Sequence, residues 1–217
     1  GKYVLGLSAT PARQDGMHPI MFMQCGDIAY ESKKEIKKIH TLKTVTSTFE
    51  ALSDDFSLIL NEMVEDFDRN NLIISEIEKL KDRNILILSE RIEHLNILYH
   101  LLDAKKIKST LIHGGLKSKI KKEFLKEANS SSIILSTSSF IGEGIDFSHL
   151  DAIVLTMPVS YWGRIVQYLG RIGRDGQECI AVDFYDENTP MLRSSFQKRQ
   201  KGYKKMGYIA LNEKGLF

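Results

Sequence analysis

The chain of 217 residues has few cysteines, no long apolar run and little net charge. Because no apolar stretch reaches 18 residues, the sequence contains no membrane span. No two Cys or His residues have the spacing of metal ligands. Cys25 and Cys179 lie in apolar, strand-like contexts, so we expect buried free thiols. The composition is that of an intracellular, cytoplasmic domain, and a net charge of +2 does not by itself indicate nucleic-acid binding.

A phosphate-binding loop, with the pattern Gly-x-x-x-x-Gly-Lys-Ser/Thr, is also missing. The nearest segment, residues 114–118, lacks both the spacing and the Gly-Lys pair. The chain opens abruptly inside an apolar, strand-like segment. We therefore expect it to be the C-terminal part of a longer protein that holds the phosphate-binding loop.

What the sequence does contain is an alternation of short apolar strands and helices. Strands are expected at Tyr3–Ser8, Ile20–Cys25, Leu42–Phe49, Ile85–Leu88, Thr110–Ile112, Ile133–Leu135, Ala152–Leu155 and Cys179–Phe184. Helical periodicity marks Phe56–Phe67, Asn71–Leu80, Ile92–Leu102, Ile120–Ala128, Tyr161–Leu169 and Met191–Lys205. This order predicts an α/β fold, a parallel sheet with helices on both faces. Ligands of such sheets bind beyond the carboxyl ends of the strands.

Two Gly-Arg pairs stand out near the C-terminal end, in the pattern Gln-x-x-Gly-Arg-x-Gly-Arg from Gln167 to Arg174. Arg171 and Arg174 are always charged, and a guanidinium group binds two phosphate oxygens at once. The glycines end the preceding helix, so they would release both side chains into a cleft. This placement suits stabilisation of charge on a transferred phosphoryl group. A solvated loop with salt bridges is the alternative.

Other polar residues follow the predicted strands at the same edge. Ser89 and Arg91 end one strand, His113 and Gly114 follow a second, and Thr137 follows a third. Small hydroxyls and backbone N–H groups at neighbouring strand ends suit a phosphodiester backbone. Helix capping and structural turns are the alternatives.

The order of these segments resembles superfamily 2 helicases and nucleic-acid translocases. The matching segments are Leu7–Pro11, Ile85–Arg91, His113–Gly115, Ser136–Asp146 and Gln167–Arg174. Residues 8–16 are most similar to the branch of the xeroderma pigmentosum group B helicase and related bacterial and phage enzymes. Residues 157–164 and 185–190 are similar to helicases of bacterial conflict and restriction-type systems.

The resemblance implies a RecA-like domain of an ATP-dependent motor. Residues 1–38 would end the first RecA-like domain, and residues 39–217 would form the second. ATP with Mg²⁺ would be bound mainly by the first domain, and the partner would be nucleic acid, DNA rather than RNA. The expected catalytic roles are contact with the ATP phosphates for Arg171 and Arg174, and orientation of their helix for Gln167. Gly144 and Asp146 would contact the nucleotide, and Ser8, Ala9 and Thr10 would couple hydrolysis to motion.

Two other interpretations stay open at this point. A non-catalytic RecA-like domain that binds nucleic acid or a partner would not need both arginines. A nucleotide-binding α/β enzyme of other chemistry would need a base and a nucleophile, for which the sequence offers no shared site. The acids Asp183 and Asp186 are interpreted as the end of an ordinary strand. The basic residues from Lys198 to Lys205 are interpreted as a solvated helix face, with nucleic-acid contact as the alternative.

Overall fold

The computed structural model describes residues 4–7, 18–30, 40–114, 130–141, 149–159, 169 and 178–211. Its strands are β1 (His40–Ser47), β2 (Ile85–Ser89), β3 (Thr110–Ile112), β4 (Ile133–Thr137), β5 (Ala152–Leu155), β6 (Cys179–Asp186) and β7 (Tyr208–Leu211). Its helices are α1 (His18–Cys25), α2 (Phe56–Glu65), α3 (Phe67–Glu78), α4 (Ile92–Ala104), α6 (Ser138–Ile141) and α8 (Pro190–Lys205).

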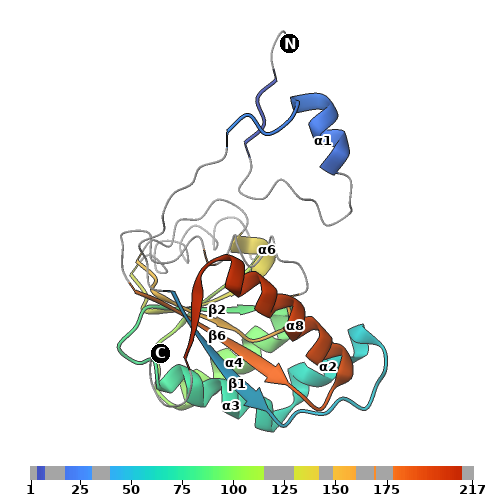
Figure 1. Cartoon of the computed structure of the whole chain (residues 1–217). Helices are drawn as coiled ribbons and strands as arrows, with labels where there is room; N and C mark the ends of the chain where they lie inside the picture. Colours follow the sequence, from blue (N-terminus) through green and yellow to red (C-terminus); the bar gives the residue numbers. More distant parts are fainter. Residues whose placement is uncertain are drawn as a thin grey trace.

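The seven strands of the described residues form one sheet in the order β3-β4-β2-β5-β6-β1-β7. Every neighbouring pair is parallel. Helix α8 covers one face, and α3 and α4 cover the other (Figure 1). The predicted α/β fold, with a parallel sheet between helices, is therefore confirmed.

Alternate residues of each central strand build two separate cores. In β2, Ile85 and Ile87 join an apolar cluster with residues of α3 and α4. Leu86 and Leu88 join a cluster with Phe140 and with Tyr203 of α8. Burying one such side chain stabilises the fold by about 1.5–3 kcal/mol. The strands are thus apolar throughout because both faces are covered.

Aspartates set the helix starts on the α3 face. Asp55 accepts hydrogen bonds from the backbone N–H groups of Ser57 (2.9 Å) and Leu58 (3.1 Å), which caps α2. Asp66 accepts from the N–H of Arg69 at 2.6 Å and caps α3. Side-chain acceptors at these positions satisfy N–H groups that have no partner within the helix.

One predicted strand is wrong, and a second is not formed in its described residues. The apolar run Ile20–Cys25 belongs to helix α1, because a short apolar run does not distinguish a helix from a strand. Residues 4–7 have no regular secondary structure. Cys179 is buried as expected, whereas Cys25 is only half-buried on α1; neither thiol is part of a disulfide. The sequence analysis also missed β7, into which Gly207 turns the chain with a φ of 73°.

A buried ion pair ties β6 to α8. Arg199 of α8 is only 3% exposed and donates to both carboxylate oxygens of Asp183, at 2.7 and 3.0 Å. The hydroxyl of Tyr203 donates to the same carboxylate at 3.0 Å. Burial first, and the Asp183 carboxylate second, raise the pKa of Tyr203. The expectation that Arg199 belongs to a solvated basic face is therefore wrong. Asp183 has a structural role.

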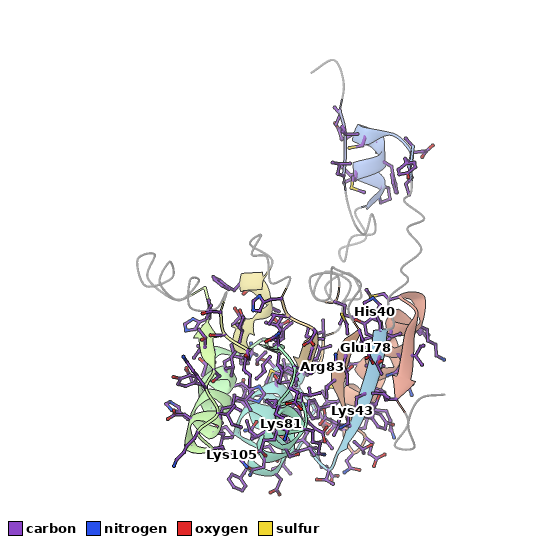
Figure 2. The ribbon with its side chains drawn as sticks, turned by 90° about the vertical axis from the view of Figure 1, so that its left-hand side faces the viewer. His40, Lys43, Lys81, Arg83, Lys105 and Glu178 are labelled. Carbon is purple, nitrogen blue, oxygen red and sulfur yellow. The ribbon has the colours of Figure 1, made fainter. Side chains whose placement is uncertain are left out.

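Half-buried charge pairs that solvent still reaches lie at the opposite, amino-terminal edge of the sheet. Arg83 precedes β2 and lies 3.4 Å from the carboxylate of Asp151 and 3.6 Å from that of Glu178 (Figure 2). Such solvent-accessible pairs contribute about 0–1 kcal/mol each. None of the described helices combines the length and the apolar character needed to cross a membrane.

Candidate nucleic-acid interface

The carboxyl ends of β3, β4 and β2 lie side by side. Ser89 is the register partner of Thr137, and Ile112 is the partner of Ser136, so His113 follows at the level of Thr137. The expectation that these three strand ends are neighbours is confirmed. That they contact phosphates stays a prediction.

Ser89 takes part in a buried chain of hydrogen bonds. Ser89 is only 2% exposed, and its Oγ lies 3.1 Å from Nδ1 of His94. Nε2 of His94 lies 2.8 Å from Oδ1 of Asn70 in α3. Asn70 is oriented by its own amide, which donates to the carbonyl of Val64 at 2.9 Å. Nε2 therefore carries the ring proton, and Nδ1 accepts from the Ser89 hydroxyl.

The hydrogen-bonded residues Asn70, His94 and Ser89 have the composition of a nucleophile triad, but a substrate could not reach the hydroxyl of Ser89. A nucleophile must reach its substrate. The Ser89 hydroxyl is buried and also accepts a hydrogen bond from the N–H of Arg91 at 3.2 Å. These hydrogen bonds therefore fix the turn after β2 and do not form a site for covalent catalysis.

His94 is held in its neutral form. It is 0% exposed, and burial first, then the charge of nearby Arg69, lower its pKa from 6.5 to about 3. A protonated ring would lose the acceptor at Nδ1 that holds Ser89.

The buried neutral His94 predicts an acid-sensitive fold. The folded-state pKa lies below the unfolded value, so between pH 6.5 and 3 the unfolded chain binds a proton that the folded chain does not. Stability should fall by about 2 kcal/mol between pH 7 and pH 5 from this residue. In His94→Gln, which cannot titrate, urea unfolding at the two pH values should show a smaller loss. An equal loss in both proteins would contradict a neutral His94.

Two further polar contacts shape the same edge. Oγ of Ser138, the first residue of α6, donates to the carboxylate of Glu90 at 2.6 Å. Oγ of Ser139 donates to Oγ1 of Thr137 at 3.3 Å. Nδ1 of His113 is buried and has no hydrogen-bond partner in the described structure. Buried polar atoms are nearly always paired, so such an atom is suited to bind a ligand or water.

Arg91 is a half-buried cation at this edge. It is the N-cap residue of α4, and its side chain makes no capping hydrogen bond. Gly114 is exposed, and a side chain there would meet nothing within 4 Å. The sequence-predicted residues Ser89, Arg91, His113, Gly114 and Thr137 are thus brought to one edge, although Ser89 and Thr137 are buried.

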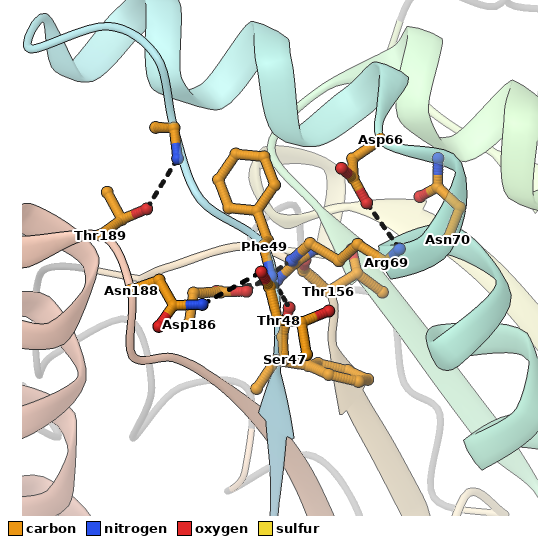
Figure 3. A network of polar contacts seen from close by, with 12 residues as sticks. Ser47, Thr48, Phe49, Asp66, Arg69, Asn70, Thr156, Asp186, Asn188 and Thr189 are labelled. Atoms are coloured by element: carbon orange, nitrogen blue, oxygen red, sulfur yellow. Dashed lines mark hydrogen bonds and ion pairs between the residues drawn. The ribbon is translucent and has the colours of Figure 1, made fainter.

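A second buried network ties α3 to the ends of β5 and β6 (Figure 3). Arg69 donates to the two carboxylate oxygens of Asp186 at 2.8 and 3.2 Å, and to the carbonyl of Thr156 at 2.8 Å. The hydroxyl of Thr156 donates to the carbonyl of Leu88 at 2.7 Å and lies 3.4 Å from Nδ1 of His94. The two networks therefore meet at Thr156, beside the candidate interface.

The sequence analysis missed His94, Asn70 and Arg69. A signal for two of them existed, because His94 precedes Leu98 and Leu102, and Arg69 precedes Ile73 and Ile77, at steps of four residues. Residues four apart share a helix face, so each polar side chain lies on an apolar stripe. A polar residue on such a stripe is expected to be buried and paired.

The remaining predicted residues lie outside the described part of the chain: Gln167, Arg171, Arg174, Gly144, Asp146, Ser8, Ala9 and Thr10. The described residues contain no group of three or more Asp, Glu, His or Cys that could hold a metal ion.

Comparison with known sequence families places the interface in context. Residues 68–176 match the helicase conserved C-terminal domain. The matched span begins in α3 and includes Ser89, Arg91, His94, His113, Thr137, Gly144, Asp146, Gln167, Arg171 and Arg174.

Curated viral proteins are similar over almost the whole chain. Protein QP509L of African swine fever virus (isolate Tick/Malawi/Lil 20-1/1983), provisionally named an ATP-dependent RNA helicase, is 28% identical over 94% of this chain and 46% of its own length. Protein 161L of Invertebrate iridescent virus 6, provisionally named a helicase, is 28% identical over 98% of this chain and 52% of its own length. The chain thus spans about half the length of the curated relatives it matches. The RNA helicase name weighs against the expectation of DNA.

Solved structures share the fold at low identity. Dbp5 of S. cerevisiae, solved with RNA and ADP BeF₃, has a TM-score of 0.65 at 17% identity over 93% of this chain and 48% of that chain. The separate C-terminal domain of the DEAD-box protein Dbp5 has a TM-score of 0.58 at 16% identity over 81% and 92%. UvsW of T4 has a TM-score of 0.61 at 15% identity over 81% and 41%. These likenesses confirm the expected RecA-like fold.

Proposed function

Because this chain belongs to the helicase conserved C-terminal domain family, we propose that it is the second motor domain of an ATP-dependent RNA helicase or translocase. The observation that carries this proposal is the family match, which includes both the strand-end residues and the box from Gln167 to Arg174. In this proposal residues 39–217 form the second RecA-like domain. Residues 1–38 end the first, which carries the phosphate-binding loop in a longer protein.

ATP is the substrate shared by the two domains. The first domain would hold most of the ATP and its Mg²⁺, because phosphate-loop and metal-binding patterns are not among the residues of this chain. Arg171 and Arg174 would reach the transferred phosphoryl group, with Gln167 orienting their helix end. Gly144 and Asp146 would contact the nucleotide, and residues 8–10 would couple hydrolysis to domain motion.

RNA is the polynucleotide that we propose for the interface. The name of a relative similar over 94% of this chain favours RNA over the DNA expected from the sequence resemblance. Contacts at the ends of β2, β3 and β4 would be made to phosphates, which carry no sequence information. Within superfamily 2, we propose the branch of the xeroderma pigmentosum group B helicase from residues 8–16 alone.

The proposal predicts binding that depends on salt and on Arg91. In the full-length protein, labelled single-stranded RNA should bind with an affinity that falls steeply between two salt concentrations, because phosphate contacts release counterions. Arg91→Glu should weaken binding and reduce the slope of log affinity against log salt by about 0.7, the value for one phosphate contact. Binding is measured by fluorescence anisotropy.

Lys81→Glu is the matched control. It makes the same change of charge at an exposed residue that precedes β2, near the opposite edge of the sheet (Figure 2). This variant should bind almost as the parent does. Equal losses in both variants would remove Arg91 from the interface. Tighter binding of DNA with the same sequence would replace RNA by DNA, and salt-independent binding would refute the phosphate contacts.

A further inference from the structure

The turn after β2 is held by buried side chains whose arrangement the motor function alone does not explain. Ser89 donates to Nδ1 of His94 and accepts from the N–H of Arg91. The carboxylate of the intervening Glu90 accepts from Ser138 of α6. Each residue of the turn is therefore fixed by a hydrogen bond.

Arg91 has an unfavourable position for its own helix. It is the N-cap of α4 with φ −122° and ψ 127°, where residues with a side-chain acceptor are preferred. A guanidinium group has no acceptor, and its charge has the same sign as the helix end. A phosphate facing this turn would be attracted both by the guanidinium group of Arg91 and by the positive N-terminal end of α4. The Ser89 hydroxyl bonds the N–H of Arg91 and thereby holds this arrangement in place.

We infer that His94 is a positioning residue for RNA binding. Through the hydroxyl of Ser89 it sets the direction in which Arg91 leaves the turn toward the RNA phosphates. His94 is 0% exposed and cannot touch RNA itself. This inference rests on the proposed function, since it needs a nucleic-acid partner for Arg91.

The histidine joins two elements that an apolar side chain would leave unconnected. Its Nε2–H bonds Asn70 in α3, and its Nδ1 bonds Ser89 at the end of β2. An apolar residue of similar volume would pack against the same neighbours. It would leave the hydroxyl of Ser89 and the amide oxygen of Asn70 buried without their partner.

Two substitutions separate the two hydrogen bonds of the ring. In His94→Asn the shorter amide reaches about as far as Nδ1 and retains the bond to Ser89. In His94→Gln the longer amide reaches about as far as Nε2 and retains the bond to Asn70 instead. For labelled single-stranded RNA and the full-length protein, His94→Gln should weaken binding about fivefold and His94→Asn less than about twofold, within the range of coupled neighbouring residues.

The decisive readout is a double-mutant cycle with Arg91→Ala. If His94 acts through Arg91, His94→Gln should change RNA affinity less than about twofold when Arg91 is already alanine. An equal loss in both backgrounds would mean that His94 only supports the fold, and would overturn the inference while leaving the proposed function intact. If the parent does not bind RNA, both the proposed function and the inference fall.

A second variant guards against loss of folding. If thermal unfolding shows that His94→Gln is not folded, Ser89→Ala takes its place, because it removes only the linking hydroxyl. Ser89→Ala should also weaken RNA binding about fivefold in the parent and less than about twofold in Arg91→Ala. Additive losses for Ser89→Ala would overturn the positioning role of His94.

Discussion

Arg174→Ala in the full-length protein should lower the rate of ATP turnover by about three orders of magnitude, the low end for loss of an arginine finger. The guanidinium group would neutralise charge that develops mainly in the transition state, so its loss should affect turnover far more than ATP affinity. Arg171→Ala should also be severe, partly through weaker coupling to RNA. Steady-state turnover and ATP binding are measured separately.

Arg193→Ala serves as the control for this prediction. Arg193 is exposed on α8 and lies outside the Gln167–Arg174 box in the sequence, and its removal makes the same change of charge. Its turnover should stay within about twofold of the parent's, as for most surface substitutions. If Arg174→Ala also stays within a few-fold of the parent, Arg174 is not a finger.

Arg69→Met should destabilise the fold by about 3–5 kcal/mol, because it leaves the buried carboxylate of Asp186 without its partner. The two side chains are only 1% and 3% exposed, and their two hydrogen bonds measure 2.8 and 3.2 Å (Figure 3). The double variant Arg69→Met/Asp186→Leu should recover most of that loss, since no unpaired charge remains. Urea unfolding at pH 7 measures all three free energies.

The more accessible Arg83–Asp151 pair at the other edge of the sheet gives the control. Arg83 is 30% exposed, so Arg83→Met should cost less than about 1 kcal/mol. A similar cost for Arg69→Met and Arg83→Met would show that burial does not strengthen the Arg69–Asp186 pair. A double variant no more stable than Arg69→Met would attribute the loss to packing, not to the unpaired charge.

Most of the sheet could be predicted because its strands are buried on both faces. Segments such as Ile85–Leu88 are apolar without interruption, and the helical runs between them require parallel strands. Helix α1 was mistaken for a strand because eight residues are too few for either periodicity to show. Strand β7 was missed because its side chains alternate weakly, and half of them are exposed.

The site was predicted only in its outline, for a physical reason. Strand ends with small polar residues are visible in a sequence, so the edge with Ser89 and Thr137 could be named. The partners that hold this edge come from other elements, such as Asn70 in α3 and Thr156 after β5. Their sequence separation gives no local pattern. A different signal exists for the buried residues Arg69, His94 and Arg199. Each is a charged or polar residue on an apolar stripe of its helix.

The most direct test of the central claim is the rate of ATP hydrolysis by the full-length protein with and without saturating single-stranded RNA. For the parent, RNA should increase the rate, because the proposed function assigns the RNA interface and the arginine box to one domain of the motor. For Arg174→Ala, the RNA-stimulated rate should fall to about a thousandth of the parent's. A parent that does not hydrolyse ATP, or that hydrolyses it at a rate unchanged by RNA, would contradict the account.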